Sequence, residues 1–486
     1  MKLTDPQLLK QQAYINGKWV DAENKSTFAV INPADGQEIT QVADLGANET
    51  RQAIEAAEQA FYSWRVKTAG ERAEILQRWY QLQLDHLEDL AIILTTEQGK
   101  PLKEATGEIR YGASFVEWYA EEGKRTYGDV IPTHAKDRRL MAIKQPIGVV
   151  AAITPWNFPH AMLARKVSPA LAAGCTVVIK PAEDTPLSAL ALAELADRAG
   201  FPPGAINVVP ALDPVGVGGE LTSNCLVRKL SFTGSTEVGK LLMRQCADTV
   251  KKLSLELGGN APFIVFDDAD LEEAVNGAII CKYRNAGQTC VGANRIYVQE
   301  GIYDAFAEKY THEVKKLKIG SGMNEDTVVG PLINQQGLEK VEALVNDAIS
   351  KGATVLAGGQ RHELGHTFYE NTVLADVTNM MKLSDNEIFG PVAPLYKFKT
   401  EEEVIKMAND TTYGLASYFY TRDLGRSWRV AEALEFGVVG VNTGLTTAAA
   451  APFGGVKESG IGREGSKYGI DEFLEIKYMC IGGIDK

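Results

Sequence analysis

Cysteine is scarce in this sequence. Its 486 residues contain only six cysteines, and no two of them form a Cys-x-x-Cys pair. This density is too low for the disulfide scaffold that is typical of small secreted proteins. We therefore expect a reducing, cytoplasmic setting, in which one reactive thiol can persist as a catalytic group. The six are Cys175, Cys225, Cys246, Cys281, Cys290 and Cys480.

Long apolar runs and an excess of basic residues are also missing. The segment from Met1 to Pro6 has no cleavable apolar run, so we expect no secretory leader. No stretch reaches the roughly 18 apolar residues that a membrane span requires, so no membrane partner is predicted. Asp and Glu total 63 against 50 Lys and Arg, a formal net charge of -13. Because a phosphate backbone requires a basic face, we expect no nucleic-acid partner.

Three short motifs match known patterns but lack the context that those patterns need. His362 to His366 spells the HExxH of zinc proteases, yet it contains Gly365 and does not predict the required helix, so no metal site is expected. Gly234 to Lys240 follows a phosphate loop until Leu241 replaces the magnesium-binding hydroxyl. Gly460 to Gly465 spells GxGxxG without a preceding strand, which predicts a glycine-rich surface loop.

Helix and strand patterns alternate through most of the chain, and its length suits two or three domains. This alternation predicts an α/β fold with two Rossmann-like open parallel-sheet lobes. Residues 50–125 read as mostly helical, and 126–146 and 474–486 read as β segments outside both series. Strands are expected at 147–153, 175–180, 206–210 and 229–233 in the first series, and at 261–266, 295–298, 417–421 and 438–442 in the second.

Cys290 and Glu256 are the candidate catalytic pair. Cys290 follows a small, polar, glycine-containing segment, and Glu256 precedes Gly258 and Gly259 near the junction of the two predicted lobes. A thiolate in such a position can attack an electrophilic carbon, and a carboxylate can activate the water that releases the product. The pair predicts covalent catalysis in a cleft between the lobes.

Seven segments in register resemble the NAD(P)-dependent aldehyde dehydrogenase superfamily. The likeness runs from about residue 15 to the C-terminus, and it is greatest to the succinate-semialdehyde dehydrogenases, as in ALEFGVVGVNTG and GIGREGSKYGIDEFLEIKY. The seven segments are ITPWNFP (153–159), KPAEDTP (180–186), FTGS (232–235), LELGG (255–259), GQTC (287–290), EIFGP (387–391) and PFGG (452–455).

The resemblance implies a domain plan and an assembly. Residues 1–125 and 147–258 would form an NAD-binding domain, and 259–473 would form a catalytic domain. Residues 126–146 and 474–486 would form a small β oligomerisation arm, through which the family assembles as dimers or tetramers. A homo-oligomer is therefore expected.

The resemblance also implies roles for three catalytic residues. Cys290 would attack the aldehyde carbon and give a thiohemiacetal. Asn157 would donate its side-chain amide to the oxyanion, with the Cys290 backbone N–H as the second donor. Hydride departure would leave a thioester, and Glu256 would deprotonate the water that hydrolyses it. Because no side chain accepts a hydride, the chemistry implies a nicotinamide cofactor.

The cofactor is expected to be NAD, with NADP as the alternative. Glu183 would accept a hydrogen bond from a free ribose 2′-hydroxyl but repel a 2′-phosphate, whereas Lys180 would tolerate that phosphate. Ser235, at a helix start, would meet the pyrophosphate. The positions that match the family's cofactor contacts are Trp156, Lys180, Glu183, Gly234, Ser235, Leu257, Glu387 and Phe389.

The expected substrate is an aldehyde with a distal carboxylate. Arg165 and Arg284 match the positions at which semialdehyde enzymes hold that carboxylate, and a guanidinium binds it bidentately. By the resemblance, Thr447 would supply the hydroxyl of the serine that many relatives have near the substrate carboxylate. Alanines follow it, so glutarate semialdehyde or a broader range of aliphatic aldehydes are alternatives to succinate semialdehyde. Gly292 replaces the cysteine that several relatives use in a disulfide switch, so no such local switch is predicted.

Two other classes of protein remain as alternatives. A non-catalytic protein could keep this fold, but a decayed enzyme would be expected to have lost one of Asn157, Glu256 and Cys290. A CoA-acylating dehydrogenase would resolve the thioester with a thiol, and such enzymes lack a carboxylate at the position of Glu256.

Overall fold

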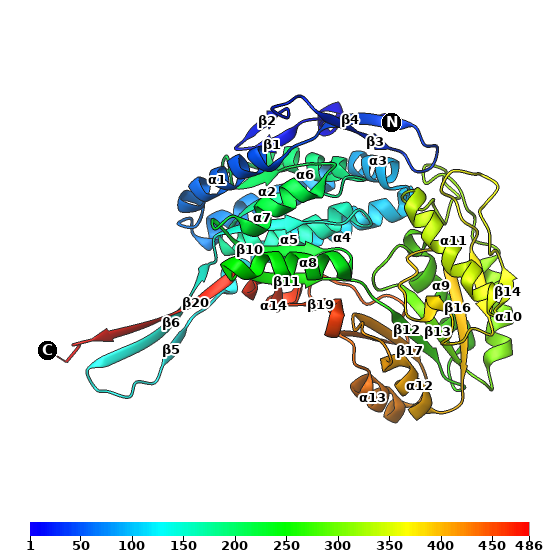
Figure 1. Cartoon of the computed structure of the whole chain (residues 1–486). Coiled ribbons are helices and arrows are strands. Elements are labelled where there is room, and N and C mark those ends of the chain that lie inside the picture. Colours follow the sequence, from blue (N-terminus) through cyan, green and yellow to red (C-terminus); the bar gives the residue numbers. More distant parts are fainter. Residues whose placement is uncertain (486) are drawn as a thin grey trace.

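Two α/β lobes and a projecting β arm make up the molecule (Figure 1). The structure is a computed structural model that describes residues 1–485. The first lobe contains an eight-stranded sheet in the order β19-β11-β10-β7-β8-β9-β1-β2. Its strands are β1 (Ala13–Ile15), β2 (Lys18–Val20), β7 (Val149–Ile153), β8 (Thr176–Lys180), β9 (Ile206–Val208), β10 (Val227–Thr233), β11 (Lys252–Glu256) and β19 (Gly460–Ile461).

The five central strands of this sheet are parallel, as the buried apolar runs predict, but its edges are not. β1 pairs antiparallel with β9, β2 pairs antiparallel with β1, and β19 pairs antiparallel with β11. The predicted open parallel sheet therefore forms the core of this lobe, and antiparallel strands extend it at both edges. Short connections allow antiparallel edge strands, whereas each parallel strand needs a crossover helix.

The second lobe contains a seven-stranded sheet in the order β14-β15-β16-β13-β12-β17-β18. All neighbours are parallel except β14 and β15. The strands are β12 (Ala261–Val265), β13 (Ala293–Gln299), β14 (Thr354–Ala357), β15 (Thr372–Ala375), β16 (Val392–Phe398), β17 (Ala416–Tyr420) and β18 (Val438–Val441). Together the two sheets confirm the predicted α/β class.

Helices cover both sheets and begin at local signals in the sequence. α2 starts with a capping box in which Thr68 and Glu71 exchange hydrogen bonds, and α5 has Pro159 at its first position. The helices are α1 (Ala47–Trp64), α2 (Ala69–Asp85), α3 (Leu87–Gln98), α4 (Leu102–Glu122), α5 (Pro159–Ala173), α6 (Pro186–Ala199), α7 (Pro214–Ser223), α8 (Thr236–Cys246), α9 (Leu271–Tyr283), α10 (Tyr303–Val314), α11 (Gln335–Ser350), α12 (Glu401–Asn409), α13 (Leu424–Ala433) and α14 (Ser466–Asp471). None of the helices in residues 1–485 combines the length and apolar character of a membrane span.

The arm is a three-stranded antiparallel sheet that extends away from both lobes (Figure 1). β6 (Arg138–Pro146) pairs with β20 (Leu474–Gly482) along its whole length, and β5 (Asp129–Ile131) completes the sheet. The two segments that fit neither predicted series thus pair with each other. A separate hairpin, β3 (Thr27–Ile31) and β4 (Glu38–Ala43), lies near the N-terminus.

The chain returns to the first lobe well before residue 473. β19 pairs with β11, and α14 packs against α4 and α5. A domain boundary at 473 therefore assigns part of the first lobe to the second. The predicted surface loop at 460–465 is also wrong, because Gly460, Glu464 and Gly465 are buried. A Cβ on Gly460 would overlap the carbonyl oxygen of Leu255, so this glycine permits a close backbone approach.

Candidate active site

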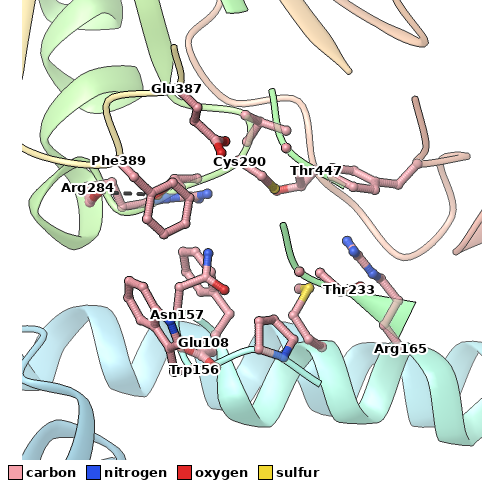
Figure 2. Close-up of a pocket in the computed structure, with 18 of the residues that line it drawn as sticks. Glu108, Trp156, Asn157, Arg165, Thr233, Arg284, Cys290, Glu387, Phe389 and Thr447 are labelled. Atoms are coloured by element: carbon pink, nitrogen blue, oxygen red, sulfur yellow. Dashed lines mark hydrogen bonds between the residues drawn. The ribbon is translucent and has the colours of Figure 1, made fainter. Parts of the chain in front are cut away.

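A cavity of about 530 Å³ lies between the lobes and contains most of the predicted site residues. Figure 2 shows Trp156, Asn157 and Arg165 on the first lobe, facing Cys290 and Glu387 on the second. Clefts between two sheets at the carboxyl ends of their strands are common ligand sites. The two lobes thus bring together residues that are far apart in the sequence.

The first lobe contributes two strand ends and a helix start. β10 and β11 pair in parallel so that Thr233 lies beside Glu256 at their carboxyl ends. Gly234 and Ser235 follow Thr233 and line the cavity. Ser235 is the N-cap of α8, where its hydroxyl accepts the backbone N–H of Val238. Free N–H groups at such a helix start attract anions.

Cys290 reaches the cavity at the end of a tightly coiled loop. Asn285 (φ 52°) and Ala286 (φ 53°) both adopt the left-handed conformation, which is uncommon for residues other than glycine. A Cβ on Gly259 would overlap the carbonyl oxygen of Cys290, so the β11–β12 connection packs directly on this loop. Burial raises the pKa of the Cys290 thiol to about 12, although the positive charge of Arg165 opposes the shift.

Asn157 is held at both ends by hydrogen bonds. Its side-chain Nδ2 donates to the carbonyl oxygen of Gln288 at 3.0 Å. Its backbone carbonyl oxygen accepts hydrogen bonds from Lys100 Nζ at 2.7 Å and from Asn285 Nδ2 at 2.8 Å. The amide carries two hydrogens, so one remains for a further acceptor. Asn157 and Cys290 both line the cavity.

Glu256 is buried, but it is not among the described residues that line the cavity. Its carboxylate lies beside Gly454, next to the cavity-lining Phe453, and its Oε2 has no hydrogen-bond partner within residues 1–485. Burial, together with the negative charge of Glu464, raises the pKa of Glu256 well above its usual range. Both effects favour the protonated form of the carboxyl.

Arg165 is a cavity residue that already has a counter-ion. It is buried on α5 and forms an ion pair with Glu464, and its guanidinium lies 4.2 Å from the centre of the Phe453 ring. Lys166 Nζ contacts the other oxygen of Glu464 at 2.5 Å. Burial would lower the pKa of Arg165, but Glu464 outweighs it and raises that pKa. Arg165 is therefore a buried residue of the cavity wall and not a surface arginine.

Arg284 lines the same cavity from the second lobe. Its guanidinium lies 5.3 Å from the centre of the Phe158 ring, and no carboxylate of residues 1–485 lies within ion-pair distance of it. Thr447 also lines the cavity, close to Leu445 and Phe453 in the loop that follows β18. The three residues predicted to bind substrate therefore share one cavity with Cys290.

The predicted cofactor residues divide into two groups. Trp156 and Phe389 meet edge to face with ring centres 5.4 Å apart, and the backbone N–H of Gly259 donates to Glu387 Oε1 at 3.0 Å. Burial raises the pKa of Glu387 to about 7. Both rings, Glu387 and Leu257 line the cavity.

Lys180 and Glu183 form the second group and lie beyond this cavity. Lys180 Nζ contacts Glu183 Oε2 at 3.3 Å after the end of β8. Lys180 is buried, whereas Glu183 borders a separate hollow of about 370 Å³ between the β3–β4 hairpin and the second lobe. The two residues are therefore adjacent to each other, as their spacing predicts.

Residues 19–479 match the aldehyde dehydrogenase family. The chain belongs to this family. A crystal structure of succinate-semialdehyde dehydrogenase from Burkholderia pseudomallei has a TM-score of 0.98 and 60% identity, with 99% of this chain and 100% of that chain covered. The family and the fold inferred from the seven sequence segments are therefore confirmed.

Three curated relatives of this aldehyde dehydrogenase carry different substrate names. A glutarate-semialdehyde dehydrogenase of Pseudomonas putida is 62% identical over 481 residues, which are 99% of this chain and 100% of the relative. An NADP(+) succinate-semialdehyde dehydrogenase of Escherichia coli is 61% identical over 482 residues, which are 99% of this chain and 100% of the relative. A 3-sulfolactaldehyde dehydrogenase of Pseudomonas putida is 60% identical over 486 residues, 100% of both chains.

Several residues of this aldehyde dehydrogenase site were not predicted from the sequence. Glu464 lies in the GxGxxG segment that was read as a surface loop, and Lys100 and Glu108 lie in a long helical stretch with no motif. A buried charged residue can be found from sequence only when a partner is recognisable nearby. Here the ion pair of Lys166 and Glu464 joins positions 298 apart, so no local pattern marks it.

Proposed function

We propose that this aldehyde dehydrogenase oxidises an aldehyde with a distal carboxylate, with succinate semialdehyde as the leading candidate. The products would be the dicarboxylate and reduced NAD(P). The observation that carries the proposal is the presence of Arg165 and Arg284 in the cavity that contains Cys290. Two guanidinium groups that share a cavity with a partly buried thiol favour a substrate with an anion at one end and an aldehyde at the other.

The chemistry of the cavity fits a nicotinamide dinucleotide. Gly234 and Ser235 at the start of α8 would hold the pyrophosphate, and Glu387 would hold ribose hydroxyls. Trp156 and Phe389 would flank the nicotinamide end. When bound, the oxidised cofactor supplies the hydride acceptor that the side chains lack.

Cys290 would begin the reaction by giving its thiol proton to solvent water and forming a bond from its sulfur to the aldehyde carbon. The carbonyl electrons move to oxygen, where the free amide hydrogen of Asn157 would stabilise the negative charge. The carbon then loses hydride, the oxyanion collapses to a carbonyl, and Cys290 holds a thioester. Water would attack that thioester, and the departing thiolate would regain its proton.

Glu256 would accept the proton of the attacking water. Its carboxyl lies beside Gly454 and outside the cavity lining, and burial favours its protonated form, so to act as this base it would lose its proton and turn toward Cys290. Arg165 favours the deprotonated form of both Cys290 and Glu256. This electrostatic bias supports a site in which the two groups become anions only during turnover.

The length of the substrate is the open part of this proposal. Relatives at about the same identity are named for succinate semialdehyde, glutarate semialdehyde and 3-sulfolactaldehyde. All three aldehydes carry an anionic group, which fits the paired arginines. We favour succinate semialdehyde. Glutarate semialdehyde is the second candidate, because the small alanine side chains after Thr447 would leave room for a longer substrate.

We further propose that NAD is the preferred cofactor. Glu183 is partly exposed beside Lys180, and its carboxylate would accept from a ribose 2′-hydroxyl and repel a 2′-phosphate. The Escherichia coli relative is named for NADP(+), so Lys180 is the feature that would allow the alternative. Measuring kcat/KM with both cofactors decides between them.

A kinetic panel tests the function. Wild type and Arg284→Ala are assayed on succinate semialdehyde, glutarate semialdehyde and butanal. Loss of a charged hydrogen bond worth ~1.5–3 kcal/mol should raise KM about 10-fold to 100-fold for the two semialdehydes but hardly for butanal. Equal changes for all three aldehydes would remove the carboxylate clamp. Cys290→Ala should abolish turnover, and wild-type turnover in that variant would overturn the nucleophile.

A further inference from the structure

A buried pair of opposite charges lies directly against Asn157. Lys100 is 1% exposed, and its Nζ is 2.5 Å from Glu108 Oε2 and 2.7 Å from the carbonyl oxygen of Asn157. Asn157 and Glu108 line the cavity, whereas Lys100 is not among its described lining residues. Lys100 therefore contacts the backbone that supports Asn157 rather than the space that would hold the substrate.

Glu108 connects this pair to the helix that follows Asn157. Its Oε1 accepts the backbone N–H groups of His160 and Ala161 in the first turn of α5, at 3.1 and 3.2 Å. The negative charge lies at the positive end of the helix dipole, which stabilises it. The ion pair thus ties α4 to the segment from Asn157 to Ala161.

The same backbone is linked to the loop that ends at Cys290. Asn285 Nδ2 donates to the Asn157 carbonyl oxygen, so that oxygen accepts from both Asn285 and Lys100. The Asn157 side chain in turn donates to the carbonyl oxygen of Gln288, two residues before Cys290. The orientation of the Asn157 amide relative to the thiol therefore depends on the peptide that Lys100 holds.

Space filling does not account for a lysine at this position. A buried ammonium loses its hydration, and an apolar side chain could occupy the same volume without that loss. Lys100 instead directs one donor to Glu108 and one to Asn157, and its Nζ lies 3.8 Å from the centre of the Phe158 ring. Each interaction contacts a residue next to, or within, the cavity.

We propose that Lys100, paired with Glu108, is a positioning residue that fixes the Asn157 peptide so that the free amide hydrogen of Asn157 points at the oxyanion. The inference rests on the proposed function, because it assigns Lys100 an effect only through the role of Asn157. It predicts that Lys100 matters when Asn157 is present and loses its importance when the amide is absent.

A double-mutant cycle tests this dependence. The rate of NAD(P)H formation from succinate semialdehyde is measured for wild type, Lys100→Met, Asn157→Ala and the combined variant. Because a misplacement of about 1 Å costs roughly 100-fold, Lys100→Met should lower the rate about 100-fold in wild type. Lys100→Met should change the rate less than about 2-fold in the Asn157→Ala background. There the contact between the Asn157 amide and the oxyanion is already absent, so the second substitution has no further contact to disturb. Equal factors in the two backgrounds would overturn the proposal.

Controls separate positioning from loss of stability. Lys229 is a second buried lysine, paired with Ser254 and Glu472 at the far end of β10, and Lys229→Met should lower the rate by the same factor in both backgrounds. If Lys100→Met does not fold, Lys100→Met with Glu108→Gln removes both charges and replaces it in the cycle. If Asn157→Ala alone is as active as wild type, the oxyanion role fails first, and the proposal fails with it.

Discussion

At the scale of single residues, the site is a balance of buried charges. Glu256 and Glu464 are both buried carboxyls, and Arg165 and Lys166 contact only the second of them as ion pairs. Glu464 stays ionised because these two cations lower its pKa against the effect of burial. The repulsion from Glu464 then adds to burial and raises the pKa of Glu256.

Glu464→Gln should shift the pH profile of thioester hydrolysis. Removing the negative charge lets Arg165 and Lys166 act on Glu256 without compensation, so the raised pKa of Glu256 should fall. If Glu256 acts as the proposed base, turnover is lost as pH falls through its pKa. The variant should therefore keep its activity to a lower pH than wild type. The pH dependence of kcat measures this shift.

Glu458 offers a matched control for that experiment. It is a partly exposed carboxylate six positions earlier, and it pairs with Lys240 at the surface. Solvent screens its charge, so Glu458→Gln should leave the low-pH side of the kcat profile at the same pH as in wild type. An unshifted limb in Glu464→Gln, or a shift toward higher pH, would contradict the electrostatic account.

At the scale of elements, the connection between β11 and β12 supports the loop of Cys290. Gly259 lies in this connection, donates its N–H to Glu387 Oε1, and packs against the carbonyl oxygen of Cys290. A single glycine thus joins a strand end of the first lobe to the proposed cofactor residue Glu387 and to the proposed nucleophile Cys290. No side chain fits there without displacing one of them.

Gly259→Ala should lower kcat about 100-fold, because the new methyl group must displace the Cys290 loop. Gly219→Ala in α7 is the control, since a Cβ there meets nothing within 4 Å. That substitution should leave activity unchanged and stabilise the helix by about 0.5–1 kcal/mol. Steady-state kinetics and urea unfolding measure the two effects. A fully active Gly259→Ala variant would contradict this prediction, because the Cys290 loop would then accommodate the methyl group without loss of activity.

At the scale of the whole molecule, the arm presents apolar side chains to solvent. Ile131, Ile476 and Tyr478 lie on one face of its sheet, and they are 40%, 73% and 58% exposed. An isolated three-stranded sheet with such a face is unusual unless another surface covers it. We therefore expect the chain to assemble as a dimer or tetramer through this arm.

Ile476→Glu combined with Tyr478→Glu should reduce the oligomer to a smaller species, because two carboxylates would be buried at the interface without partners. Sedimentation velocity measures the size. Trp428→Glu on α13 is the control, since Trp428 is equally apolar and 67% exposed but lies far from the arm (Figure 1). A monomeric wild type, or a double variant of unchanged size, would refute the role of the arm.

The sequence by itself determined the family, the alternation of strands and helices, and several of the residues that line the cavity. These features are local: a buried strand is an apolar run, and Cys290, Asn157 and Arg284 each stand in a short motif. Only the tertiary structure decided that Arg165 has Glu464 as a counter-ion, that Glu256 lies behind the cavity wall, and that Lys100 holds Asn157. Burial and charge pairing depend on which distant segments pack together, and spacing along the chain does not specify that packing.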